Sequence, residues 1–60
     1  MRLKALREER DMTQADLAKR AGVSPGYIAR LETLRHDPKL STLVKIAKAL
    51  NVTVAQLLEQ

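Results

Sequence analysis

The sequence contains no cysteine, tryptophan or phenylalanine, and its only aromatic residue is Tyr27. Without cysteine, it can form neither a disulfide nor a thiolate metal site. Its core must therefore be aliphatic, built from Leu, Ile, Val and Ala, with Met12 as a further candidate. An aliphatic core in a chain of 60 residues leaves a thin margin of stability. This length allows one small domain, spanning residues 1–60.

Long hydrophobic runs are absent as well. No apolar stretch approaches the roughly 20 residues that a membrane-spanning helix requires. The basic N-terminus, with Arg2 and Lys4, is not followed by the apolar region of a secretory signal. We therefore expect a cytoplasmic protein, which agrees with the lack of cysteine.

Side chains with catalytic chemistry are scarce. The single histidine, His36, lies beside Asp37 in an expected loop, with no further group to orient it as a base. The only serines, Ser24 and Ser41, occupy expected helix starts. A lone histidine and scattered carboxylates also lack the ligand spacing of a metal site. We therefore expect neither an enzyme nor a bound metal or other cofactor.

Positive charge, in contrast, is plentiful. The net charge is +4 and the isoelectric point lies near 10.0. In so small a domain, this balance favours a polyanionic partner such as nucleic acid. Many small domains are basic, so the charge gains weight only where it coincides with a nucleic-acid-binding motif.

Residues 13–32 predict two short helices joined by a tight turn. Thr13 is a favourable N-cap for the first helix, with an acidic residue three positions later. Gly22 suits the left-handed conformation that ends a helix. Ser24 is a second N-cap, and Pro25 follows it at the first helical position, where its missing N–H is no loss.

Apolar residues recur at helical spacing on one side of each expected helix: Leu17, Ala18, Ala21, Ile28 and Leu31, with Val23 in the turn. A plain helical hairpin used only for packing would show the same periodicity. Two caps, a turn glycine and an apolar turn residue coincide here with a basic chain. Together they favour a helix-turn-helix.

This pattern resembles the phage-repressor and Cro type of helix-turn-helix, the XRE family. The resemblance rests on Thr13-Gln14, Leu17-Ala18, Gly22-Val23-Ser24, Ile28 and Leu31-Glu32, and continues through Pro38, Leu43, Ile46-Ala47, Leu50, Val52 and Leu57-Leu58. It implies an all-α, compact five-helix bundle of the lambda-repressor-like DNA-binding type. In that fold, helices 2 and 3 form the helix-turn-helix, and the protein is usually dimeric on its operator.

The expected helices cover residues 2–10, 14–21, 25–33, 41–50 and a short segment capped by Thr53. The fourth is expected to bury a stripe of Leu43, Val44, Ala47 and Leu50. Asn51 can end it in a left-handed conformation. Leu34 stands where family members commonly have glycine. Either the third helix runs longer, or Leu34 takes a strained conformation.

The outward side of residues 25–33 is the expected base-reading surface. The planar fork of Arg30 can bond guanine O6 and N7 together, or it can contact phosphate alone. Pro25 and Gly26 cannot donate a side-chain hydrogen bond to a base. Recognition is therefore expected to depend more on DNA shape and phosphate contacts than on direct base contacts. Helix capping alone explains Ser24. The expected base or groove set is Ser24, Pro25, Gly26, Ala29 and Arg30.

The expected phosphate contacts are Thr13, Gln14, Tyr27, Arg35, His36 and Lys39. Free N–H groups at the start of the helix 14–21 form a natural phosphate clamp. The resemblance implies that Gln14 donates to the same phosphate, and the alternative is a solvent-exposed polar residue of the first turn. The basic cluster before residue 41 makes a second clamp, with a solvated loop as the alternative. The hydroxyl of Tyr27 can reach phosphate, and partial burial of the ring is equally compatible with its position.

Two structural roles complete the predictions. The resemblance implies that Arg7 and Glu32 form a family ion pair joining the first helix to the end of the third. Two unrelated surface charges are the alternative. The last helix has more apolar residues than a terminal turn needs. We expect a dimer seam there, formed by Val54, Leu57 and Leu58, unless all of them pack inward.

These features predict a sequence-specific regulator of transcription, in its simplest form a repressor, that binds double-stranded DNA as a homodimer. No small-molecule ligand or membrane partner is evident. The alternative is an antitoxin-like or adaptor module that uses the same helices to bind protein. Gln14 and Arg30 favour DNA, whereas Pro25 and Gly26 leave room for the alternative. The two functions differ in a measurable property: a DNA-binding regulator should lose affinity for duplex DNA steeply as salt concentration rises, whereas an adaptor should bind DNA weakly and without sequence preference.

Overall fold

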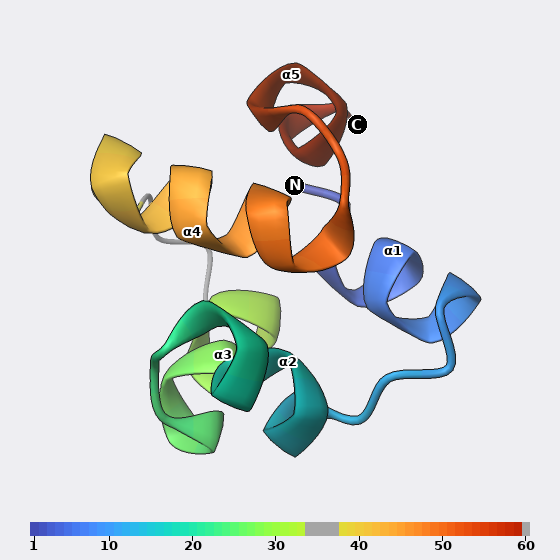
Figure 1. Ribbon diagram of the computed structural model, residues 1–60, viewed down its shortest axis with the longest axis vertical. Coiled ribbons are helices and arrows are strands. Elements are labelled where there is room, and N and C mark those ends of the chain that lie inside the picture. Colours follow the sequence, from blue (N-terminus) through green and yellow to red (C-terminus); the bar gives the residue numbers. More distant parts are fainter. Residues whose placement is uncertain (34–37, 60) are drawn as a thin grey trace.

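The computed structural model describes residues 1–33 and 38–59. Those residues form five helices and no strand: α1 (Leu3–Glu9), α2 (Gln14–Ala21), α3 (Pro25–Thr33), α4 (Leu40–Leu50) and α5 (Val54–Leu58) (Figure 1). The predicted all-α, five-helix fold is therefore confirmed. Helices α2 and α3 match the expected ranges, α1 is shorter than expected by one residue at each end, and α4 begins one residue earlier than expected.

Local capping bonds define the helix-turn-helix. The hydroxyl of Thr13 accepts a hydrogen bond from the Asp16 N–H at 2.9 Å, and the Asp16 carboxylate accepts one from the Thr13 N–H at 2.9 Å. Gly22 ends α2 with φ of 73°, in the left-handed region that glycine adopts without strain. The hydroxyl of Ser24 then accepts from the Tyr27 N–H at 3.1 Å, which caps α3.

The end of α1 shows a backbone feature that the sequence did not signal. Asp11 adopts a positive φ of 53°. Asn51 also has a positive φ, 58°, in agreement with its predicted left-handed conformation. Asp and Asn enter this region more readily than most residues because their short polar side chains can bond locally. At Asp11 the chain folds back, and the Met12 N–H donates to the Arg7 carbonyl at 3.1 Å. This turn brings Met12 next to the Arg7 side chain.

Helix α4 lies across the middle of the molecule, with α5 on one side and the α2–α3 pair on the other (Figure 1). The residues with no or almost no exposed surface are aliphatic and come from every helix: Leu3, Leu17, Ile28, Ile46, Leu50 and Leu57. Ala18 and Ala21 are also buried, and their small side chains let α2 approach its neighbours closely. The Arg2 N–H donates to the Leu57 carbonyl at 2.8 Å, which ties the two ends of the domain together.

Two of the expected apolar roles were wrong. Leu57 has no exposed surface, so it belongs to the core of the monomer and cannot line a dimer seam. Val44 is 36% exposed and lies outside the buried stripe of α4, where Ile46 takes the inward position instead. Leu58, in contrast, is 46% exposed, and Val54 is half-buried. Only these two of the three expected seam residues reach the surface.

Within residues 1–33 and 38–59, none of the helices has the length and apolar character needed to cross a membrane.

Candidate nucleic-acid interface

The first turn of α3 presents an open surface. Ser24, Pro25, Gly26 and Arg30 are exposed, and Ala29 is half-buried. A Cβ atom added to Gly26 would meet no atom within 4 Å, so packing does not require glycine there. The expected groove-reading residues therefore lie on one accessible face. This face carries a single charged side chain, Arg30.

Arg30 is not extended freely from this face. Its guanidinium carbon lies 5.9 Å from the centre of the Tyr27 ring, at cation–π distance. Tyr27 is itself half-buried and packs against the core. Arg30 thus lies over the ring, on the flank of α3 that lines a groove together with the start of α4.

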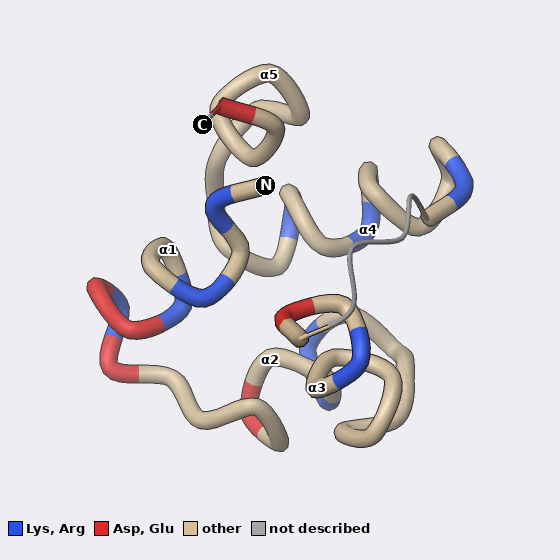
Figure 2. The backbone as a smooth tube through the Cα atoms, turned by 180° about the vertical axis from the view of Figure 1, so that it is seen from behind, with Lys and Arg blue, Asp and Glu red and all other residues tan. Residues whose placement is uncertain are grey.

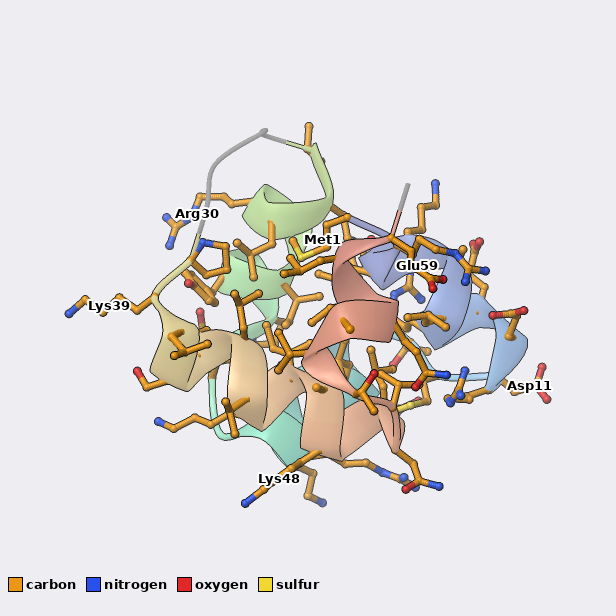
Figure 3. The ribbon with its side chains drawn as sticks, turned by 90° about the horizontal axis from the view of Figure 1, so that it is seen from above. Met1, Asp11, Arg30, Lys39, Lys48 and Glu59 are labelled. Atoms are coloured by element: carbon orange, nitrogen blue, oxygen red, sulfur yellow. The ribbon has the colours of Figure 1, made fainter. Side chains whose placement is uncertain are left out.

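An open groove of about 590 Å³ runs along this flank, lined by Val23, Ser24, Tyr27, Arg30, Pro38, Lys39 and Thr42. Lys39 is exposed, and its side chain makes no capping hydrogen bond to the first turn of α4. Figure 3 shows Arg30 and Lys39 on the same side of the molecule, pointing outward. The groove is thus lined by two cationic residues, one from α3 and one from the N-cap of α4.

The charges of the described residues are unevenly distributed. Glu8, Glu9 and Asp11 lie close together at the end of α1, and single acidic residues lie on α2, on α3 and after α5, whereas α4 carries only basic charge (Figure 2). A polyanion would therefore meet no acidic side chain along α4. Two expected phosphate contacts, Arg35 and His36, lie outside the described residues.

The predicted ion pair between α1 and α3 is confirmed. Arg7 donates to both carboxylate oxygens of Glu32, from Nε to Oε2 at 2.7 Å and from Nη2 to Oε1 at 3.2 Å. Its Nη1 donates to the Met12 carbonyl at 2.6 Å. The side chains of Arg7 and Glu32 are only 10% and 4% exposed. A bidentate, shielded pair of this kind fixes the orientation of the two helices.

A third residue, which no sequence pattern indicated, joins this pair. The side-chain amide of Gln14, at the first position of α2, donates from Nε2 to Glu32 Oε1 at 3.0 Å. The sequence predicts Gln14 as a phosphate donor or as a solvent-exposed polar residue, and neither prediction includes a contact with Glu32. Its partner is 18 positions away, so no local pattern could reveal the bond. Glu32 thus connects the first three helices at the side where α2 begins.

The ionisation of the pair follows from its surroundings. Burial raises the pKa of Glu32, but hydrogen bonds from Arg7 and Gln14 and the nearby positive charge outweigh burial, so its pKa lies below the ordinary value. The hydrogen bond to Glu32 raises the pKa of Arg7. Both side chains are therefore charged at neutral pH.

Acid should destabilise the domain through Glu32. Because its pKa is lower in the folded than in the unfolded state, its charge stabilises the fold above the unfolded value, and this contribution is lost as pH falls through the folded pKa. We expect the melting temperature to drop as pH is lowered from about 5 toward 3. The drop should be smaller in Glu32→Gln. Circular dichroism melts across this range measure both proteins, and equal drops would contradict the prediction.

Among residues 1–33 and 38–59, no three His, Cys, Asp or Glu side chains come together in a way that could hold a metal ion.

An exposed second helix, a glycine turn and an ion pair bracing the first helix together define a helix-turn-helix domain of the phage-repressor type. A family model described as helix-turn-helix matches residues 3–57, and the chain belongs to this family. The chain is 46% identical over 54 residues to an immunity repressor protein of Bacillus phage phi105, covering 90% of this chain and 38% of that protein.

Two further relatives broaden the comparison. The antitoxin HigA1 of Mycobacterium tuberculosis is 40% identical over 55 residues, covering 92% of this chain and 37% of that protein. The crystal structure of the clp gene regulator ClgR from C. glutamicum superposes with a TM-score of 0.84 at 34% identity, covering 93% of this chain and 73% of that one. This chain therefore spans well under half the length of the two sequence relatives. The three proteins are named as an immunity repressor, an antitoxin and a gene regulator.

Proposed function

We propose that this chain is a sequence-specific, double-stranded DNA-binding regulator of transcription, acting as a repressor in the cytoplasm and reading the major groove with α3. The observation that carries this proposal is the exposed face of Pro25, Gly26 and Arg30, on which packing does not require the glycine at position 26. The candidate phosphate donors are Gln14 at the start of α2 and Lys39 beside the groove. A base-reading helix between two phosphate contacts is the arrangement by which helix-turn-helix proteins dock.

Selection of bound sites from random duplex DNA tests the proposal. An enriched motif is expected, together with an affinity that falls steeply as salt concentration rises. Binding that is weak and blind to sequence would favour the second candidate function, a protein-binding antitoxin-like module. The similarity to HigA1, named as an antitoxin, is the observation that keeps this candidate.

Arg30→Ala should weaken binding to the selected site by roughly 1–3 kcal/mol and relax preference at one base pair. The reason is that Arg30 is the only side chain of the exposed α3 face that can donate a bidentate pair to guanine. Titration against the selected site and single-base variants measures both effects. An equal loss on every sequence would assign Arg30 to phosphate instead. Because the side chain leans over Tyr27 toward the α3–α4 groove, this control is essential.

We also propose that the functional unit on DNA is a homodimer with α5 at its seam. One recognition helix makes few base contacts, and a pair of them about 34 Å apart reads two half-sites. Leu58 and the half-buried Val54 supply the exposed apolar surface. Native mass spectrometry on a selected site should give two chains per duplex, and Leu58→Lys should disrupt the pair. One chain on an asymmetric site would exclude the dimer.

A further inference from the structure

The hydrogen bond between Gln14 and Glu32 places a carboxylate directly behind a candidate phosphate donor. Gln14 occupies the first position of α2, where the backbone N–H groups have no partner within the helix. Its Nε2 carries two N–H groups, and Glu32 Oε1 accepts from that nitrogen at 3.0 Å. A second N–H thus remains on the same nitrogen for a DNA phosphate oxygen.

Glu32 is well suited to hold this amide. Its side chain is 4% exposed, and two bonds from Arg7 fix the carboxylate. The Arg7 guanidinium is fixed in turn by the Met12 carbonyl at 2.6 Å. Gln14 is therefore attached to a rigid, shielded group rather than to a mobile surface side chain.

We propose that Glu32 is a positioning residue for DNA binding, which orients the Gln14 amide toward a phosphate at the start of α2. This inference rests on the proposed function and deepens it. According to this proposal, the nearly buried carboxylate of Glu32 strengthens the binding of DNA, although both are negatively charged. Simple electrostatics predicts the opposite sign, because removing a negative charge near DNA strengthens binding. The two explanations therefore differ in the direction of the effect.

Glu32→Gln is the informative substitution because it keeps the size of the side chain. The amide retains one oxygen, which is best placed on Arg7 Nε, the partner at the shorter distance of 2.7 Å. The NH2 group of the new glutamine then faces Gln14 Nε2. Two donors lie opposite each other, and the hydrogen bond between residues 14 and 32 is lost. The Gln14 side chain must turn away or reverse its amide. Either change alters what it offers to phosphate.

The experiment is a double-mutant cycle on a duplex found by site selection, with Gln14→Ala, Glu32→Gln and the double variant. Binding is titrated at several salt concentrations, below each protein's melting temperature. We expect each single variant to weaken binding about 3- to 10-fold and to lower the slope of log affinity against log salt by about one. Because Glu32 acts through Gln14, the double variant should bind DNA no more weakly than the single variant with the lower affinity.

Glu9→Gln is the matched control, since it makes the same charge change at an exposed position of α1. It should bind as tightly as the unmodified protein or slightly tighter. If Glu32→Gln behaves like Glu9→Gln, or if the effects of the two single variants multiply, the proposal is overturned. The side-chain amide signals of Gln14 in NMR spectra give a readout without DNA. They should move in Glu32→Gln, and unchanged signals would also overturn the proposal.

The failure of the proposed function has a different signature. In that case the unmodified protein shows no sequence-selective, salt-dependent binding to duplex DNA, and the positioning role of Glu32 is refuted together with the proposed function. Failure of the inference alone leaves unmodified binding intact.

Discussion

Replacing Glu32 with alanine should lower the free energy of unfolding by about 3 kcal/mol or more. The substitution removes both acceptors of Arg7 and leaves a guanidinium that is only 10% exposed without its counter-charge. Removing one partner of a shielded pair costs far more than the pair itself contributes, because the remaining charge has lost its solvation and its partner. In a domain of this size, a loss of this magnitude corresponds to a fall of more than about 10 °C in melting temperature.

Glu9→Ala is the control for this measurement. Glu9 is also a glutamate near arginine, but its side chain is 58% exposed and its closest approach to Arg10 is 4.0 Å. Exposed pairs of this kind contribute about 0–1 kcal/mol. Thermal and urea unfolding of both variants gives the comparison. Equal stabilities would mean that the ion pair does not brace the domain.

The second large effect is expected at two neighbouring leucines of α5. Leu57→Ala should cost about 2–5 kcal/mol because the side chain is wholly buried and its removal leaves a cavity. Leu58→Ala should change stability by no more than about 0.5 kcal/mol, since Leu58 is 46% exposed. Unfolding of the free protein at a concentration where it is monomeric measures both.

The contrast also separates folding from pairing. Leu57→Ala should reduce DNA binding only through the loss of folded protein, whereas Leu58→Lys should leave the monomer folded and weaken the dimer on DNA. A Leu58 variant as unstable as Leu57→Ala would show that the two leucines share one structural role.

Much of the helix-turn-helix was predictable from the sequence because the signals that form it act over a few residues. The Thr13 cap, the Gly22 turn and the Ser24 cap bond within their own segments, and the structure confirms each of them. Apolar spacing likewise gave the helix bounds and the inward sides of α2 and α3. The Arg7–Glu32 pair was found only through family resemblance, because its members are 25 positions apart.

The orientation of the last two helices could not be read in the same way. Helix α5 has five residues, too few turns for apolar spacing to define an inward side. Only its packing on α4 decided that Leu57 is core and Leu58 is surface. In α4, both Val44 and Ile46 are β-branched and apolar, and the position of the neighbouring helices decided that Ile46 is buried.

The same division holds at the candidate site. The sequence by itself determined which residues face outward on α3 and that Gln14 begins α2, since helix periodicity and capping are local. Only the tertiary structure decided that the Gln14 amide meets Glu32 and that Arg30 leans over Tyr27 beside the α4 groove. Those contacts depend on the angles at which helices cross. These angles are set by the packing of many core side chains and not by any one segment.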